Sequence, residues 1–307
     1  NFAYSLASAL LCGNPSIVRI SSTNFPQAEK LIEHINEILE IGSFPPFLTI
    51  IQYEHDAMMK SRQISVNEYL SQKCKVRMLW GGDKTISYFK QISSNQDAVD
   101  ITFPNKYSIC LIDGESYLAY PDKEQIARRF YADAYTFDQN GCSSPRCIFW
   151  ITRDANALQA QDIFWKSISE VIAQNEYQTG LGVGVRHVIH SAQLAVEKIG
   201  KLSKSNYSNN ITLFDIKNQS HEIFLNPIAE GFFFQADIAS LDEIDPYISE
   251  KCQTLTYFGD IRNDIKEYLH QERPKGIDRV VEFGQASNFD LNWDGKELVY
   301  LMTKRLL

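Results

Sequence analysis

One segment of the chain places a cysteine among residues that form a rigid turn. The segment reads Phe137-Asp138-Gln139-Asn140-Gly141-Cys142-Ser143-Ser144-Pro145. A run with helical character, Glu124 to Tyr135, precedes it, and an apolar run typical of a strand, Cys147 to Ile151, follows it. A nucleophilic thiolate must be both accessible and fixed in its line of approach, and such a turn provides both. The pattern therefore predicts Cys142 as a nucleophile, against the ordinary alternative that it is a small buried hydrophobe.

The overall composition restricts the classes of partner. The chain has 307 residues, of which 44% are hydrophobic and 22% charged, as in ordinary globular proteins. Its net charge of −8 and pI of about 5.3 argue against bulk attraction to nucleic acid or to an anionic membrane surface. No apolar run approaches the roughly 20 residues that an integral membrane span requires.

The spacing of the cysteines and histidines along the chain does not indicate a metal site. The six cysteines are scattered without the spacing of metal ligands, which fits a reducing cytoplasm. His187 and His190 lie three residues apart on a helical run, but no third ligand accompanies them. We expect both histidines to be ordinary helix residues.

Strand-length apolar runs alternate with segments of helical period, which indicates an α/β fold with parallel sheets. The expected strands include Ile17–Ile20, Phe47–Ile51 and Val76–Trp80, and Pro26 is expected to begin a helix. A second domain is expected to begin near Lys106. In it we predict helices over Asp162–Ala173 and Gly184–Leu202, and one capped by Asp260 that runs through Leu269.

Several segments together resemble one family. The Cys142 segment is similar to the nucleophile signature of the long-chain acyl-CoA reductases (LuxC family). These form the fatty-acid reductase component of bacterial bioluminescence and are a branch of the aldehyde dehydrogenase superfamily. Further similar segments are Asn1-Phe2-Ala3-Tyr4-Ser5-Leu6, Leu11 to Arg19, Phe283-Gly284-Gln285-Ala286 and Phe289 to Gly295. Their order along the chain matches that of the family.

The resemblance implies an aldehyde-dehydrogenase-like architecture of two Rossmann-type domains with parallel sheets. Residues 1–105 would form the cofactor-binding domain, 106–282 the catalytic domain, and 283–307 a C-terminal segment returning to the cofactor or oligomerisation region. Because the chain opens on Asn1 within a functional-looking segment, we expect part of the cofactor domain to precede it.

The resemblance also implies an oxyanion site. The backbone N–H of Cys142 is one expected donor, and the side-chain amide of Asn1 would be the second. The alternative for Asn1 is a helix cap with no catalytic part.

The cofactor site is expected from two segments. Gly81 and Gly82, between a strand and a helix, would lie beside the nicotinamide, although many such pairs are only turns. By the resemblance, Arg19 stands where the superfamily usually carries a lysine that contacts the adenosine ribose. Ser22, beside Ser21, stands where relatives that prefer NAD usually carry a glutamate for the ribose hydroxyls. A cation and hydroxyls would instead attract a 2′-phosphate, so we expect NADPH/NADP; the alternative for Arg19 is a surface charge at the end of a strand.

Two departures from the superfamily affect the mechanism. The stretch Tyr107 to Ile112, where hydrolytic relatives carry a glutamate base, has no carboxylate, which disfavours aldehyde oxidation. Asp113 and Glu115 remain weak candidates for a base. The segment Tyr53-Glu54-His55-Asp56 replaces a glycine-rich turn, so the dinucleotide would be held differently.

The function implied is NADPH-dependent reduction of long-chain fatty acyl-CoA, or of an acyl-protein thioester, to fatty aldehyde through an acyl-cysteine. The resemblance further implies a cytoplasmic homo-oligomer that can associate with an acyl-protein synthetase. The alternatives are a non-catalytic scaffold with this fold in a lipid-metabolic complex, and an aldehyde-oxidising dehydrogenase. Neither nucleic acid nor a membrane span is expected.

Overall fold

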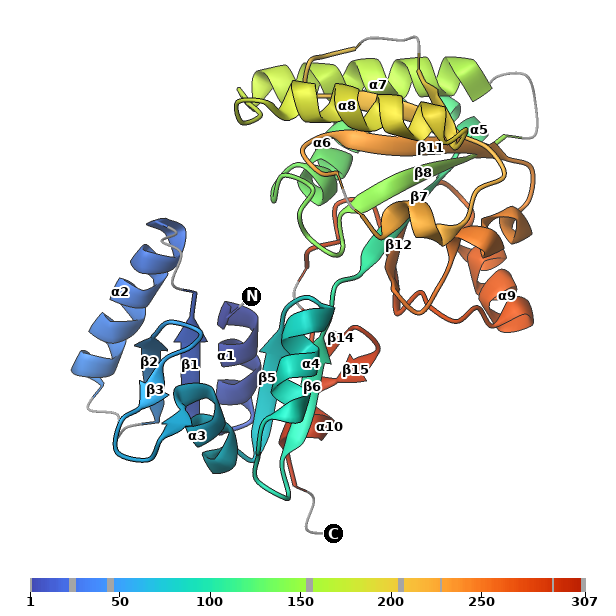
Figure 1. The fold of residues 1–307 in the computed structure, drawn as a ribbon. Helices are drawn as coiled ribbons and strands as arrows, with labels where there is room; N and C mark the ends of the chain where they lie inside the picture. Colours follow the sequence, from blue (N-terminus) through green and yellow to red (C-terminus); the bar gives the residue numbers. More distant parts are fainter. Residues whose placement is uncertain are drawn as a thin grey trace. The chain divides into compact units, whose positions relative to one another are not determined.

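The chain forms two compact units, each described here by itself (Figure 1). The computed structural model describes residues 2–21, 26–42, 47–152, 157–203, 207–226, 228–288 and 290–304. The first unit comprises residues 1–105 and 289–307, and the second comprises residues 106–288. Residues 283–288, which the sequence pattern assigns to a C-terminal segment, therefore pack within the second unit. The labels cofactor-binding domain and catalytic domain remain predictions.

The first unit contains short parallel strand pairs with helices around them. Its helices are α1 (Phe2–Leu11), α2 (Pro26–Ile41), α3 (Val66–Lys73), α4 (Asp83–Gln91) and α10 (Leu298–Met302). Strand β1 (Ser16–Ile20) pairs in parallel with β2 (Leu48–Gln52), and β5 (Val76–Trp80) pairs in parallel with β6 (Val99–Phe103). Two small antiparallel pairs are β3 (Met58–Met59) with β4 (Ile64–Ser65), and β14 (Asn292–Trp293) with β15 (Lys296–Glu297).

Helix α10 completes the small core of the first unit. Leu298 and Met302 of α10 pack with the buried Ile101 and Phe103 of β6. The ring of Phe103 stacks on that of Trp80, with 4.0 Å between centroids. These contacts bury apolar surface that the short strand pair β5–β6 could not cover alone.

The second unit is built on a seven-stranded sheet with the order β13-β12-β7-β8-β11-β10-β9. All neighbouring strands in it are parallel except the edge strand β9. The strands are β7 (Tyr107–Asp113), β8 (Pro145–Ile151), β9 (Gly200–Leu202), β10 (Thr212–Ile216), β11 (Phe232–Ile238), β12 (Cys252–Phe258) and β13 (Arg279–Glu282). The helices are α5 (Gly114–Ala119), α6 (Lys123–Ala134), α7 (Ala157–Gln174), α8 (Val183–Val196), α9 (Arg262–Glu272) and the 3-10 helices η1 (His221–Phe224) and η2 (Leu241–Tyr247).

Both faces of this sheet are covered, as a parallel sheet requires. Alternate residues of β7 point to opposite faces: Ile109 belongs to one apolar cluster and Cys110 to the other. Side chains of α5, α6 and α7 pack on the Cys110 face, while α8, α9 and the 3-10 helices pack on the Ile109 face. The central strand β8 is therefore buried on both sides, and its position is fixed by packing.

Two expectations for single elements were wrong. The helix expected over Gly184–Leu202 ends at Val196, because Gly200–Leu202 pairs with β10 as an edge strand. Asp260 does not cap α9, whose N-cap residue is Ile261, without a capping side chain. The backbone N–H of Asp260 instead donates to the Ser116 hydroxyl at 3.3 Å.

None of the helices in the described ranges is long and apolar enough to cross a membrane.

Candidate active site

Cys142 lies on the turn that joins α6 to β8, at the amino end of the central strands. Strands β7 and β8 are parallel, with Ser108 opposite Pro145, so the turn before Pro145 lies at the amino edge of the sheet. The side chain of Cys142 is partly exposed and forms no disulfide. Position and exposure thus fit the predicted nucleophile.

The backbone just before Cys142 is unusual. Asp138 and Gln139 both adopt left-handed conformations, with φ of 50° and 58°. Gln139 is 1% exposed, and its amide group donates to the carbonyls of Pro145 (3.0 Å) and Phe232 (2.8 Å). Its side-chain oxygen accepts the N–H of Gly231 at 3.1 Å. The Gln139 side chain therefore ties the turn to the starts of β8 and β11.

A second buried group holds the turn from β7. The hydroxyl of Ser108, which is fully buried, donates to the backbone carbonyl of Cys142 at 2.6 Å and accepts the N–H of Thr254 at 3.1 Å. Neither Ser108 nor Gln139 was singled out from the sequence. The Gln139 position lies inside the Cys142 signature, but nothing local shows that its side chain turns inward.

The backbone N–H groups of Cys142 and Ser144 differ in their hydrogen bonding. Within the described ranges the N–H of Cys142 donates no hydrogen bond, whereas the N–H of Ser144 closes the turn on the Gly141 carbonyl at 3.0 Å. A free, fixed N–H beside a nucleophile can stabilise negative charge on a substrate oxygen.

A partly buried arginine accompanies the cysteine. Arg146, four residues further along, donates to the Phe224 carbonyl at 2.7 Å, and its Nε has no partner among the described residues. Burial lowers the pKa of Arg146, while the ionised thiol of Cys142 raises it. The sequence pattern did not identify Arg146 as part of this site.

The other cysteines of the sheet are poor nucleophiles. Cys147 and Cys110 are completely buried, and burial raises the pKa of each thiol well above its ordinary value. Cys147 is thus a core residue of β8.

Asp113 and Glu115 are not placed to act as a base for Cys142. Asp113 lies opposite Ile151 at the carboxyl end of β8, about 20 Å of extended strand from Pro145. Its carboxylate caps α5 by accepting the N–H of Ser116 at 3.2 Å. Glu115 lies in the first turn of α5, at the same edge. Both candidates from the sequence are therefore wrong, because a residue at the end of a strand reaches only that edge of the sheet.

The segment Phe283 to Ala286 is bound to the helix that leads to Cys142. Asp133, near the end of α6, accepts the N–H groups of Gly284 (2.7 Å) and Ala286 (2.9 Å). Gly284 has a left-handed φ of 82°, and a side chain there would crowd Arg129. The segment Phe283 to Ala286 and the helix that leads to Cys142, which are far apart in sequence, thus meet around a buried carboxylate.

On the first unit, Arg19 and Ser21 lie at the carboxyl edge of β1 and β2. The exposed Arg19 donates to the Tyr53 carbonyl at 3.1 Å, and its guanidinium lies 4.8 Å from the centre of the Tyr53 ring. The Ser21 carbonyl accepts the Gln52 amide at 2.8 Å. Asn1 and Ser22 lie outside the described residues.

Gly81 and Gly82 join β5 to α4 as expected, with Gly82 at the N-cap. A Cβ at Gly81 would come within 2.9 Å of the Thr85 side chain. Close packing of α4 is thus sufficient to require glycine at position 81, whether or not a cofactor lies nearby.

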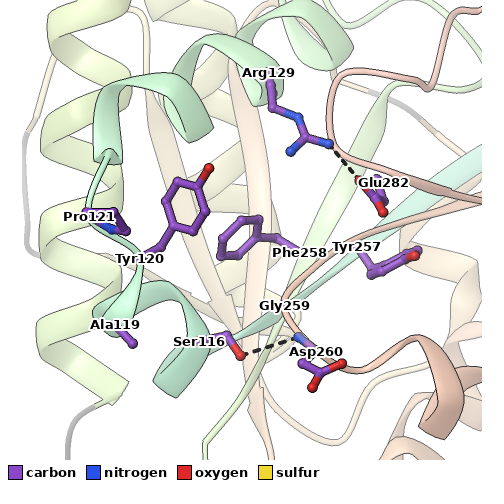
Figure 2. A pocket seen from close by; sticks show the side chains of 10 residues that line it. All are labelled: Ser116, Ala119, Tyr120, Pro121, Arg129, Tyr257, Phe258, Gly259, Asp260 and Glu282. Atoms are coloured by element: carbon purple, nitrogen blue, oxygen red, sulfur yellow. Dashed lines mark hydrogen bonds and ion pairs between the residues drawn. The ribbon is translucent and has the colours of Figure 1, made fainter.

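A separate cleft of about 530 Å³ opens at the carboxyl edge of the seven-stranded sheet in the second unit (Figure 2). Its walls come from α5 and from the end of β12, with Tyr120 against Phe258 at 5.5 Å between ring centres. Arg129 and Glu282 form an ion pair of 3.0 Å along its rim. The cleft is distant from Cys142, since it lies at the carboxyl ends of strands whose amino ends face the cysteine turn.

The histidines have structural partners. His187 is buried, with ring nitrogens 2.9 Å from the Thr212 hydroxyl and 3.0 Å from the Ala229 carbonyl, and burial lowers its pKa. His190 packs on the ring of Phe232. In the part of the chain that the structure describes, no group of three or more potential ligands could hold a metal ion.

A family model described as acyl-CoA reductase (LuxC) matches residues 2–176. No curated protein matches the chain. Among solved structures, the bifunctional proline utilization A (PutA) protein is similar with a TM-score of 0.62 and 12% identity, covering 94% of this chain and 29% of that chain. A lactaldehyde dehydrogenase is similar with a TM-score of 0.63 and 12% identity, covering 91% of this chain and 58% of that chain.

An NADP-dependent glyceraldehyde-3-phosphate dehydrogenase from Bacillus halodurans C-125, solved with NADP, gives a TM-score of 0.57 and 13% identity, covering 91% of this chain and 57% of that chain. The chain thus spans less than two thirds of each of these structures. At such identities the likeness shows the fold, which is that of the aldehyde dehydrogenases. Because the family model matches more than half of its length, the chain belongs to the acyl-CoA reductase (LuxC) family.

Proposed function

We propose that the protein reduces long-chain acyl thioesters, such as fatty acyl-CoA, to aldehydes through an acyl-enzyme on Cys142. The observation that carries the proposal is the partly exposed thiol on a rigid turn, beside an unpaired backbone N–H, in a chain of this family. The thiolate attacks the carbonyl carbon, the new carbon–sulfur bond forms, and CoA or a carrier thiol leaves. The Cys142 N–H stabilises the negative oxygen at this step.

NADPH, when bound, supplies the hydride that reduces the acyl group. Cys142 then departs as a thiolate and releases the aldehyde. The carboxyl edge of β1 and β2 fits a nucleotide phosphate, because Arg19 and Ser21 are both exposed there and Arg19 carries a positive charge. Gly81 and Gly82, at the N-terminus of α4, are the proposed neighbours of the nicotinamide. Asn1 is proposed as the second oxyanion donor.

The absence of a carboxylate in the buried part of β7 favours reduction over aldehyde oxidation. Residues Tyr107 to Ile112 of this strand are buried, and the first acidic residue after them lies at the far edge. Water would then have no base beside Cys142 from this strand, so an acyl-cysteine would survive until it is reduced.

We also propose a homo-oligomer, with α8 as a contact between two copies. Val185, Ile189, Ala192 and Val196 form an exposed apolar stripe on this helix. Their spacing of four, three and four residues reads the same in both directions. An antiparallel second copy would place Val185 opposite Val196 and Ile189 opposite Ala192, as a two-fold contact requires. A synthetase partner and a cytoplasmic location remain proposals from the family, the latter in keeping with six free cysteines.

The test is acyl transfer in the full-length protein. Radiolabelled long-chain acyl-CoA should leave a thiol-labile label on the wild type, and NADPH should release it as aldehyde. Cys142→Ala should lose both the label and aldehyde formation. Cys74→Ala, which removes another partly exposed cysteine, is the matched control. A label that persists in Cys142→Ala would exclude this nucleophile, and a wild type that never acquires a label would support a scaffold.

A further inference from the structure

The nucleophile turn carries strain that some interaction must offset. Two consecutive non-glycine residues, Asp138 and Gln139, are in the left-handed region, which residues with a side chain rarely adopt. Such conformations persist when the surrounding structure over-determines them, and they concentrate at functional sites. The contacts that hold this turn are therefore candidates for a role in catalysis.

The peptide groups on both sides of Cys142 are fixed through their carbonyls. The Gly141 carbonyl accepts the Ser144 N–H at 3.0 Å, and the Cys142 carbonyl accepts the Ser108 hydroxyl at 2.6 Å. In a planar trans peptide the N–H points opposite to the C=O. The Cys142 N–H is thus turned away from the turn's own hydrogen bond, and the Ser143 N–H is turned away from the buried Ser108.

Ser108 can fix the peptide group between Cys142 and Ser143 because it is itself fixed. Its hydroxyl is fully buried and accepts the Thr254 N–H of β12, so its proton is left to donate to the Cys142 carbonyl. Gln139 fixes the other end of the turn, with both its donors and its acceptor bonded to backbone groups of Pro145, Phe232 and Gly231. Rotation of either peptide group would leave buried polar groups without partners, which is costly.

We propose that Ser108 and Gln139 are positioning residues that hold the backbone of the Cys142 turn in place, so that the N–H of Cys142 faces the acyl oxygen. This inference rests on the proposed function of Cys142. Neither side chain needs to touch the substrate, since Ser108 acts on the carbonyl of Cys142 and Gln139 acts on the ends of the turn. Loss of either bond should let the peptide groups turn and misplace the N–H, and a misplacement of about 1 Å can reduce a rate by about 100-fold.

The test compares acyl transfer with simple alkylation of the same thiol in the full-length protein. Ser108→Ala and Gln139→Met should each slow single-turnover acylation by roughly 10–100-fold, with KM for acyl-CoA unchanged. Alkylation of Cys142 by iodoacetamide needs no oxyanion donor, so it should change by about twofold at most. A selective loss of acylation is what a merely structural role would not produce.

Two controls measure the effect of losing an equivalent bond elsewhere in the sheet. Thr256→Val removes a buried hydroxyl that bonds the Ile109 carbonyl between the same strands, and Gln235→Met removes a buried amide on β11. Both should keep wild-type acylation even if their thermal midpoints fall as much as those of the test variants.

Acylation by Ser108→Ala and Gln139→Met at the rate of these controls would overturn the proposal. Cys142→Ala separates this failure from failure of the function. If Cys142→Ala is inactive while Ser108→Ala and Gln139→Met acylate normally, the nucleophile stands and the positioning role falls. If Cys142→Ala still acylates, the proposed function falls, and the positioning role falls with it.

Discussion

The carboxylate of Asp133 accepts the backbone N–H of Ala286 at 2.9 Å and so joins the helix before the nucleophile to a segment 153 residues further along. Burial raises the pKa of Asp133 to about 6, although the hydrogen bonds from Ala286 and Gly284 and the nearby Arg129 lower it. This carboxyl group changes its charge near neutral pH, inside the structural support of the Cys142 turn.

The stability of the second unit should depend on this group. A carboxyl whose folded pKa is raised contributes stability that is present below its ordinary pKa of 3.8 and is lost as pH rises through about 6. The wild type should therefore lose up to roughly 3 kcal/mol relative to Asp133→Asn between pH 4 and pH 7. Unfolding midpoints across this range measure the difference. Asp162→Asn, which alters an exposed carboxylate, is the control. A constant separation between wild type and Asp133→Asn would contradict the prediction.

Arg146 should support the ionised thiol of Cys142. Arg146→Met removes a partly buried positive charge that interacts with this thiolate, so alkylation by iodoacetamide at pH 7 should slow several-fold. Alkylation rates measured over a range of pH, as a rate profile, give the comparison. Arg129→Met, which also removes an arginine bonded to a backbone carbonyl, should alkylate normally. Equal alkylation rates for Arg146→Met and wild type would show that Arg146 does not act on the Cys142 thiol.

Arg19 should set the preference for NADPH. Arg19→Met can keep the contact with the Tyr53 ring but loses the charge for a 2′-phosphate, so the ratio of kcat/KM for NADPH to that for NADH should fall by roughly 10–100-fold. Ser22→Glu should shift the ratio the same way through like-charge repulsion. Arg62→Met, which alters another arginine above a tyrosine ring, serves as the control. An unchanged ratio in both test variants would place the phosphate elsewhere.

Asn1→Ala should slow acylation by about 100- to 1,000-fold if its amide is an oxyanion donor. Thioester binding should change little, because the charge that the amide would stabilise exists only in the transition state. Single-turnover acylation with Cys142 intact measures the effect. A variant that acylates normally and loses only thermal stability would indicate a helix cap.

The α8 stripe should control self-association. Ile189→Glu places a charge at the centre of the proposed two-fold contact and should convert the oligomer to a smaller species in sedimentation velocity. Leu225→Glu, at another exposed apolar residue of the second unit, should sediment as wild type. An unchanged sedimentation coefficient for Ile189→Glu would exclude α8 as the contact.

Local sequence was sufficient for features that depend on neighbouring residues. The strand Val76–Trp80 was predicted with its observed bounds, and the glycine pair after it does begin α4. The turn at Cys142 was also correctly placed between a helix and a strand, because glycine, serine and asparagine favour turns through their own backbone and side-chain chemistry. The sequence by itself thus determined the α/β alternation and the place of Cys142 on a turn between a helix and a strand.

Only the tertiary structure decided what surrounds that nucleophile. Ser108 hydrogen-bonds to the Cys142 carbonyl, 34 residues away in the sequence, and Gln139 hydrogen-bonds to the Phe232 carbonyl, 93 residues away. These contacts depend on the order and register of β7, β8, β11 and β12, and no local periodicity encodes the register between strands that are distant in sequence. The same register excluded Asp113 as a base by placing it at the opposite edge. Residue types near one another in the chain can therefore identify a reactive group, but the partners that orient it come from the assembled sheet.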